Sequence, residues 1–173
     1  TLVSKSESFV LNEINRKIRH EIEFNKKLKP LLQKTEKWSD SYFVVRNLIY
    51  NKEVAFEGLG IGGQLRGGRR GLIVLDDLED EESAISEEQR DKLKRRIGKE
   101  IAPKLLPEGE MCYFGTPVHQ LCYLHQIIRT PDNGWVKRIY PAYKSSEQKT
   151  GNESWAEMFP HSRLQEFKNT WGT

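Results

Sequence analysis

The amino-acid sequence predicts an α/β fold in which a mostly parallel sheet is flanked by helices and carries a peripheral β-hairpin. Patterns typical of strands and helices alternate in the order strand, helix, hairpin, loop, strand, helix, strand. The uncharged run 71–75 has the length of a strand that is buried on both faces, as in a parallel sheet. This run leads straight into five acids among the six positions 76–81. Open α/β sheets bind ligands at the carboxyl ends of such strands.

Composition fits one globular domain with a polar surface. The chain has 173 residues, of which 36% are hydrophobic and 31% charged. A net charge of +3 does not by itself predict a nucleic-acid partner. No apolar run approaches the roughly 20 residues of a membrane span, so we expect no membrane association. Cys112 and Cys122 offer no disulfide framework, and a reducing compartment is the expectation.

The first third of the sequence predicts a strand, a helix and a hairpin. Residues 1–4 have the pattern of a strand end. Ser4 has capping-box spacing to Glu7, and Ser6 is an alternative cap. We expect a helix from there to about Lys29, which Pro30 ends. The expected β segments that follow are 42–46, 48–50 and 53–57, with a turn at 51–52.

The rest of the chain predicts a second strand–helix–strand unit and a less regular end. Seven glycines among residues 58–71 indicate a loop. Ser86 and Gln89 form a capping pair for a helix that Pro103 ends or bends. The further expected elements are a strand at 110–114, a helix at 120–129, a β segment at 135–143, a polar linker at 144–153 and a helix at 162–170.

Asp76 and Asp77 are the strongest candidates for chemistry. Two adjacent carboxylates at a strand end can hold hydrated Mg²⁺ and polarise a water molecule, as a Walker B motif does in nucleotide hydrolysis. Asp76 would hold the metal, and Asp77 or Glu79 would orient or deprotonate the water. The alternative is a solvated acidic helix start. That alternative explains residues 81–88 well and the Asp76–Asp77 pair poorly.

Two further motifs fit phosphoryl transfer. Arg66 lies in the glycine loop and would supply positive charge to a transferring phosphate, as an arginine finger does. The loop is not a P-loop, because the chain contains no Gly-x-x-x-x-Gly-Lys-Ser/Thr. Gly115 and Thr116 follow the second apolar strand, where Thr116 would sense the γ-phosphate. The alternatives are a flexible loop and a simple strand-to-loop turn.

Other clusters have weaker functional interpretations. Cys112, His119, Cys122 and His125 can be drawn as a zinc set, but they lack a paired Cys-x-x-Cys spacing. The tryptophans near the carboxyl end could stack on single-stranded nucleic acid, although packing explains them more simply. The lysines at 26–29 are typical of a solvated helix face and could also touch a phosphate backbone.

Taken in order, these motifs resemble the large subunit of phage terminases, the ATPase motors that package viral DNA. The resemblance rests on residues 2–7 before a helix, the glycine loop with Leu65-Arg66-Gly67, the run 72–77, and residues 115–119. It covers about residues 1–130. Beyond that, the chain is similar to the linker that leads to the nuclease domain of the family.

The resemblance implies an ASCE/RecA-like P-loop NTPase core without its Walker A portion. Residues 1–143 would be a partial ATPase domain and residues 144–173 a linker. Asp76 would be the Walker B magnesium residue, and Arg66 would act on the nucleotide of a neighbouring subunit. Many members have Glu where this chain has Asp77, which leaves Asp77 and Glu79 open as the base. Gly115 and Thr116 would be the coupling motif.

The resemblance also implies function and partners. The complete protein would hydrolyse ATP with Mg²⁺ to drive double-stranded DNA into a procapsid and would cut that DNA. Its partners would be further copies in a ring, the small terminase and the portal, in the cytoplasm of an infected host cell. Walker A is expected upstream of Thr1 and the nuclease carboxylates beyond Thr173, so this chain alone is expected to be inactive. The alternatives are a helicase-like ATPase and a non-enzymatic DNA- or capsid-binding module.

Overall fold

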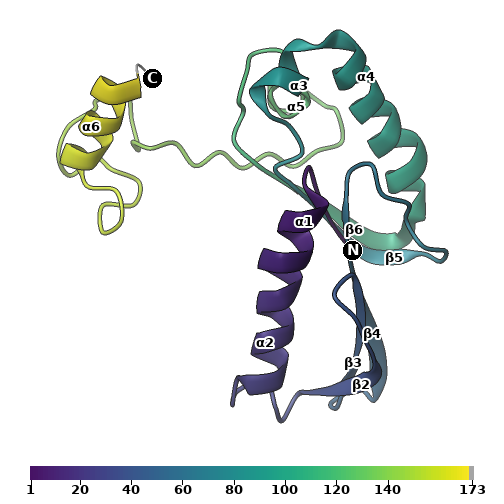
Figure 1. Ribbon diagram of the computed structural model, residues 1–173. Coiled ribbons are helices and arrows are strands. Elements are labelled where there is room, and N and C mark those ends of the chain that lie inside the picture. Colours follow the sequence, from purple (N-terminus) through teal and green to yellow (C-terminus); the bar gives the residue numbers. More distant parts are fainter. Residues whose placement is uncertain (172–173) are drawn as a thin grey trace. The chain divides into compact units, whose positions relative to one another are not determined.

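The computed structural model describes residues 1–171 and divides the chain into two compact units (Figure 1). The first unit spans Thr1–Pro131, and the second begins at Asp132. No helix among residues 1–171 combines the length and the apolar character needed to cross a membrane.

The first unit contains a six-stranded sheet with the strand order β2-β3-β4-β1-β5-β6. Four neighbouring strands, β4, β1, β5 and β6, run parallel, while β2 and β3 add an antiparallel extension to β4. The prediction of a mostly parallel α/β sheet with a hairpin is therefore confirmed. The strands are β1 Leu2–Ser4, β2 Leu32–Trp38, β3 Tyr42–Asn47, β4 Lys52–Gly60, β5 Arg70–Asp76 and β6 Leu105–Phe114.

One face of the parallel strands is covered by the helical segment between β5 and β6. This segment consists of α3 (Glu81–Ile85), α4 (Glu87–Arg96), a π-helical turn (Ile97–Ile101) and a 3₁₀ turn (Ala102–Lys104). Ser86 caps α4 by accepting a hydrogen bond from the Gln89 N–H, as its spacing predicts. The buried side chains of this core are Val3, Leu59, Ile73, Leu75, Leu78, Leu93, Ile97 and Ile101.

β5 is not buried on both faces, contrary to the sequence expectation. Ile73 and Leu75 are fully buried, whereas Leu72 is 48% exposed and Val74 is partly buried. Leu72, Val74 and Asp76 share one side of the strand because side chains alternate along it. Among residues 1–171, the helices cover only part of that side. The apolar run therefore indicated a buried strand correctly but overstated how much of it is covered.

The opposite face is covered near β1 and β4 by a continuous helical segment. It comprises α1 (Glu7–Phe9), a π-helical segment (Val10–Asn15) and α2 (Arg16–Phe24). Ser6, the alternative cap, accepts a hydrogen bond from the Phe9 N–H. The helix ends before the expected Lys29, because the extended Asn25 accepts a hydrogen bond from the Lys27 N–H through its side chain.

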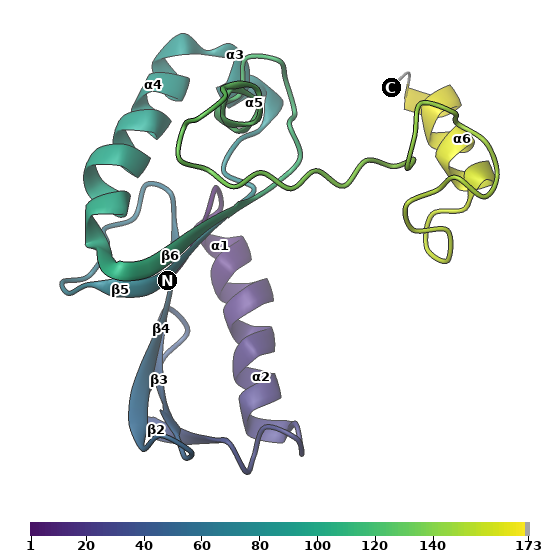
Figure 2. The same ribbon diagram turned by 180° about the vertical axis from the view of Figure 1, so that it is seen from behind.

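The antiparallel strands β2, β3 and β4 form an arm that lies beside α2 (Figures 1 and 2). Phe43, Val45 and Ile22 make a second core between the arm and the helix. Sequence patterns missed β2, because most of its side chains are exposed and polar. The expected β segment at 48–50 is a turn. The Asn47 side chain accepts hydrogen bonds from two of its backbone N–H groups and so curls the chain.

The carboxyl-terminal part of the chain is helical at two places. In the first unit, α5 (Tyr123–Arg129) follows β6. In the second unit, α6 spans His161–Trp171, close to the expected 162–170. The expected β segment at 135–143 is wrong, since only Tyr143 forms a bridge, to Glu153. Residues 135–142 have no partner strand among the described residues.

Candidate functional site

Asp76 is the last residue of β5 and lies at the carboxyl edge of the parallel sheet. It is level with Ser4, the last residue of β1, and with Phe114, the last residue of β6. Asp77 follows with φ of 42°, a left-handed conformation that Asp tolerates better than most residues. The backbone therefore turns sharply at the strand end. This turn holds two adjacent carboxylates at the edge where α/β sheets bind ligands.

The two carboxylates repel one another and have no hydrogen-bond or ion-pair partner in the part of the chain that the structure describes. Partial burial, and secondarily the charge of Asp77, raise the pKa of Asp76 above its ordinary value. Within residues 1–171, no group donates a hydrogen bond to the side chain of Asp76 or Asp77. A bound divalent cation would relieve this repulsion and satisfy the free oxygens. The residues present therefore fit the carboxylate part of a magnesium site.

Gly115 brings the loop after β6 against Asp77. The Asp77 N–H donates a hydrogen bond of 3.2 Å to the carbonyl oxygen of Phe114. A Cβ added to Gly115 would lie 3.2 Å from Asp77 Oδ1 and equally near Leu124 Cδ2. Thr116 is exposed beside this contact. The structure thus brings together Asp76, Asp77, Gly115 and Thr116, four of the residues that the sequence indicated.

Glu79 lies nearby, but both of its carboxylate oxygens already have partners. Oε1 accepts the Tyr123 N–H at 2.7 Å, and Oε2 accepts the Leu124 N–H at 3.0 Å and the Tyr113 hydroxyl at 3.2 Å. Burial, and then the charge of Glu79, raise the pKa of Tyr113. Glu79 therefore caps the first turn of α5 and ties the acidic strand end to β6. Sequence patterns gave no signal for this role.

Lys5 is a further residue at this edge that sequence reasoning did not single out. It follows β1, and its ammonium group forms an ion pair with Asp80. Asp80 also caps α3 through a reciprocal capping box with Ser83. Lys5 therefore fastens the end of β1 to the segment that begins directly after the acids. Its position after a predicted strand end was the available signal.

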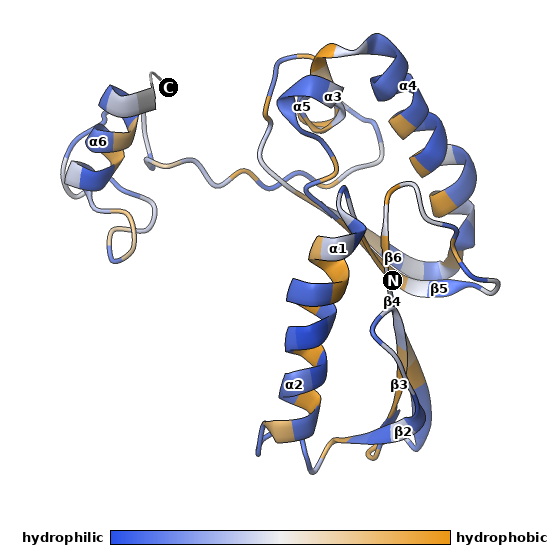
Figure 3. Ribbon diagram, viewed as in Figure 1, coloured by the Kyte–Doolittle hydropathy of each residue, from blue (hydrophilic) through white to orange (hydrophobic). Residues whose placement is uncertain are grey.

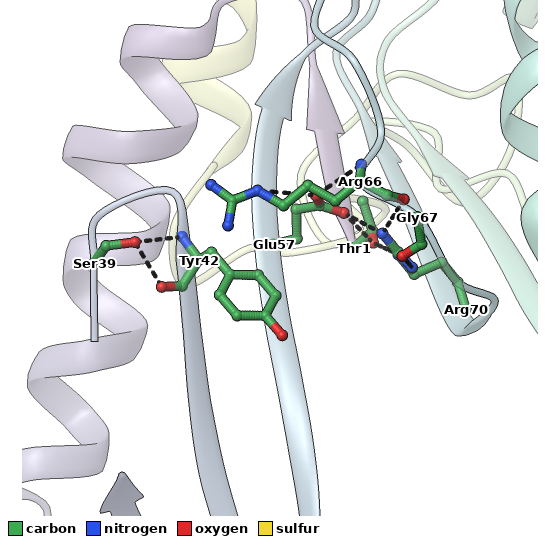
Figure 4. A network of polar contacts seen from close by, with 7 residues as sticks. All are labelled: Thr1, Ser39, Tyr42, Glu57, Arg66, Gly67 and Arg70. Carbon is green, nitrogen blue, oxygen red and sulfur yellow. Dashed lines mark hydrogen bonds and ion pairs between the residues drawn. The ribbon is translucent and has the colours of Figure 1, made fainter. Parts of the chain in front are cut away.

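Arg66 is held at a different place, by a network around Glu57 (Figure 4). The buried Glu57 carboxylate pairs with Arg70 at 2.6 Å and accepts the backbone N–H of Arg66 at 3.2 Å. The Arg66 guanidinium extends over the Tyr42 ring, 4.9 Å from its centre. Arg70 also donates to the carbonyl oxygens of Arg66 and Gly67. The backbone at Arg66 is anchored in this way, while its side chain stays more than half exposed.

The structure does not bring Arg66 together with the acids. Arg70, which anchors it, begins β5, whereas Asp76 ends that strand. At about 3.3 Å per residue, the two ends of β5 lie about 20 Å apart. The first half of the loop is fixed separately, since Arg96 of α4 donates to the carbonyl oxygens of Ile61 and Gly63. Arg66 and the acids of the same chain therefore lie at separate places in the first unit.

The four residues of the zinc alternative do not form a common site, and three of them make hydrogen bonds to nearby backbone atoms. Cys112 lies within β6, and Cys122 caps α5 by accepting the His125 N–H. The His125 ring contacts the Gln120 carbonyl oxygen, and the His119 ring accepts the Leu121 N–H. Among residues 1–171, no three His, Cys, Asp or Glu side chains gather as a metal site.

A groove of about 1090 Å³ lies between the loop at Ile61 and Gly62 and the helices α3 and α4. Lys5, Glu79 and Arg96 line it, but Asp76, Asp77 and Thr116 do not. Asp76 is partly exposed and Asp77 is exposed, so the acids lie at the surface of this edge of the sheet.

Comparison with known proteins does not assign this chain to a family. No family model matches the chain, and no match was found among curated proteins.

Proposed function

We propose that this chain is part of the ATPase motor of a DNA-packaging protein of the terminase large-subunit class. The observation that carries the proposal is the placement of Asp76 and Asp77 at the carboxyl end of β5, with Asp77 against Gly115 and with no ion-pair partner for either acid among the described residues. In this proposal the Asp76 carboxylate holds the magnesium ion, and Asp77 accepts a hydrogen bond from the attacking water. Magnesium, when bound, offsets the negative charge of the phosphate oxygens.

Asp77 is a better candidate base than Glu79. Both Glu79 oxygens accept hydrogen bonds from the start of α5, so a proton taken up there would weaken that cap. Asp77 has no such partner among the described residues and touches the Gly115 loop. A change in the charge at Asp77 would therefore act directly on the position of the loop that bears Thr116. This contact supports the role of Gly115 and Thr116 as the coupling motif.

An open edge and an open face support the P-loop class. Within residues 1–171, β6 pairs only with β5, so one edge of this ten-residue strand is free. The exposed Leu72 and Phe114 lie on the same side of β5 and β6 as Asp76. In the proposal, the strand and helix that flank a Walker A loop pair with β6 and cover these side chains. The phosphate-binding loop would then reach the acids from the β6 side.

The separation of Arg66 from Asp76 supports action between subunits. An arginine finger supplied in trans must be held firmly by its own subunit and stay exposed. Glu57 and Arg70 hold the Arg66 backbone, and the guanidinium, whose Nε lies 3.9 Å from Glu57 Oε1, stays more than half exposed. The proposal therefore assigns Asp76 and Arg66 to two different nucleotide sites of a ring, one on each side of a subunit.

Mixing of variants tests this assignment in the complete protein. Asp76→Ala and Arg66→Ala should each abolish ATP turnover when present in all subunits. Mixed in equal amounts, they should restore turnover, because roughly a quarter of the interfaces then combine an intact Asp76 with an intact Arg66. The control is a mixture of Asp76→Ala with Asp76→Ala/Arg66→Ala subunits, which offers no intact interface. Turnover that stays at the control level would contradict action between subunits.

Metal binding tests the acids on their own. Mg²⁺ or Mn²⁺ should raise the melting temperature of the chain, and Asp76→Ala should remove that increase. Glu81→Ala, an exposed acid nearby, is the matched control and should keep it. An equal rise in melting temperature for the wild-type chain and Asp76→Ala would contradict the proposal that Asp76 holds the metal. In that case the non-enzymatic DNA- or capsid-binding alternative would be favoured.

A further inference from the structure

The far end of the β2–β4 arm carries an unusual combination of charge and apolar surface. We define the arm tip as residues 24–32, between α2 and β2, together with residues 47–52, between β3 and β4. The two segments lie side by side, because Leu32 pairs with Asn47 and the Leu48 N–H donates to the Leu31 carbonyl oxygen at 2.8 Å. They project beyond the helix and the strands (Figure 1).

The tip is strictly basic. It contains Lys26, Lys27, Lys29 and Lys52, and no Asp or Glu. All four lysines are exposed, and none forms an ion pair within residues 1–171. Elsewhere on the arm, Lys34 pairs with Glu23 at 2.6 Å and Arg46 with Glu53 at 3.3 Å, and Lys37 directly follows Glu36 in the sequence. The sequence therefore balances charge along the arm and leaves it unbalanced at the end.

Large apolar side chains are exposed among these lysines. Tyr50 is 71% exposed, Ile49 64% and Phe24 62%, and Leu31 and Leu48 are also exposed. Figure 3 shows hydrophobic segments between the hydrophilic loops at this end of the arm. Single exposed apolar residues need no explanation, but a cluster of this kind at a protruding turn marks an interaction site.

We propose that the arm tip binds double-stranded DNA, with its lysines on the phosphates and Ile49 and Tyr50 entering a groove. Unpaired lysines suit phosphate contacts, because each releases counterions when it neutralises a phosphate. Apolar side chains on DNA-binding ribbons insert into the minor groove between base steps. A protein partner suits the tip less well, since protein interfaces are depleted in lysine and enriched in arginine. Only the choice of DNA as the polyanion rests on the proposed function.

A salt titration with matched variants tests the proposal. Binding of the full chain to a short labelled duplex is followed by anisotropy from about 50 to about 200 mM salt. The tip variant changes Lys26, Lys27, Lys29 and Lys52 to Gln. It should bind DNA at least tenfold more weakly at low salt, and its log–log salt slope should fall by about 2 to 4. Melting temperatures of both proteins establish that the variant is folded.

The control variant removes the same charge from four other lysines without an ion-pair partner within residues 1–171, namely Lys92, Lys99, Lys104 and Lys144. It should keep most of the affinity and the slope. A second variant, Ile49→Ser/Tyr50→Ser, should weaken binding severalfold at an unchanged slope, because it removes groove contacts and no charge. Equal losses in the tip and control variants would overturn the proposal, since net charge alone would then explain binding.

Two additional measurements distinguish DNA binding at the tip from membrane binding and from the chemistry of the acids. Vesicles containing phosphatidylserine test a membrane partner: binding that needs the tip lysines, with wild-type DNA affinity in the tip variant, overturns the proposal. Asp76→Asn should leave DNA binding unchanged, because the tip and the acids are separate sites. Loss of DNA binding in the tip variant would therefore support this inference even if the metal test at Asp76 failed. Intact DNA binding would overturn it even if that test succeeded.

Discussion

The carboxylate of Asp77 lies against Gly115, with Oδ1 only 3.2 Å from the place where a Cβ on Gly115 would be. This contact joins the acidic end of β5 to the loop that follows β6. The contact favours glycine at position 115, because a Cβ would press on Asp77 and on Leu124 together.

Gly115→Ala should therefore impair catalysis more than folding. Asp77 must move by a few tenths of an ångström, and misplacement of this kind should lower the turnover of the complete protein by about tenfold. The free energy of unfolding should change by less than about 1 kcal/mol, because Gly115 is exposed and the nearest atoms are the ends of two side chains that can shift, those of Asp77 and Leu124. Steady-state kinetics and urea unfolding measure the two effects. Wild-type turnover in Gly115→Ala would contradict the proposed coupling.

Asp76→Asn should stabilise the fold at neutral pH. Burial and the neighbouring Asp77 raise the pKa of Asp76 in the folded state above its ordinary value of 3.8. The folded state therefore binds a proton on Asp76 more tightly than the unfolded state does. Once the pH rises above the raised pKa, the charged Asp76 carboxylate lowers the free energy of unfolding. The melting temperature of Asp76→Asn should exceed that of the wild type at pH 7 without Mg²⁺.

The same difference should shrink as the pH falls through the raised pKa of Asp76, because both proteins are then uncharged at this position. Saturating Mg²⁺ should also narrow it, since the ion stabilises only the wild type. Melting curves of both proteins between about pH 4 and pH 8, a range that begins near the ordinary pKa of a carboxylate, measure the pH dependence. The same curves with and without Mg²⁺ measure the effect of the ion. A destabilised Asp76→Asn at pH 7 would mean that the Asp76 carboxylate has a stabilising partner.

Glu79→Ala should destabilise the chain, because it leaves the N–H groups of Tyr123 and Leu124 and the Tyr113 hydroxyl without an acceptor. Loss of acceptors for partly buried donors predicts a decrease of about 2 kcal/mol in the free energy of unfolding. The exposed Glu81 provides the control, and Glu81→Ala should change the free energy of unfolding by less than about 0.5 kcal/mol. Similar, small effects of both substitutions would argue against the capping role.

Substitutions of Glu57 and of Arg66 should differ in their effect on the free energy of unfolding. Glu57→Ala leaves the mostly buried Arg70 unpaired and frees the loop, so unfolding should become easier by about 2 to 4 kcal/mol. Arg66→Ala removes an exposed side chain and should cost less than about 1 kcal/mol. Limited trypsin digestion at Arg66 and Arg69 should be faster in Glu57→Ala. Unchanged digestion would show that Glu57 does not anchor the loop.

The sequence predicted the parallel part of the fold because its signals are local. The apolar run before Asp76 and the Ser86 cap each depend on a few adjacent residues; the cap forms as expected, and the run forms a strand, although only one of its faces is fully buried. β2 escaped detection because its stability comes from β3 and the second core and not from its own polar sequence. The early end of α2 depended on one side-chain hydrogen bond of Asn25, which competes with the helix pattern.

The candidate site was predictable in part for the same reason. Asp76, Asp77 and Gly115 meet because the ends of neighbouring parallel strands meet, which strand order alone implies. The capping role of Glu79 and the ion pair of Lys5 with Asp80 depend on the paths of loops. No local pattern encodes those paths. The anchoring of Arg66 by Glu57 likewise joins residues from β4 and the loop that no spacing rule connects.

The central claim is that Asp76 holds the metal that serves ATP hydrolysis. Steady-state ATP turnover by the complete protein, with Asp76→Ala compared with Glu81→Ala at saturating Mg²⁺ and DNA, tests it most directly. Asp76→Ala should lose at least about 100-fold in turnover while remaining folded, and Glu81→Ala should keep wild-type turnover. Wild-type turnover in Asp76→Ala, or an equal loss in both variants, would contradict it.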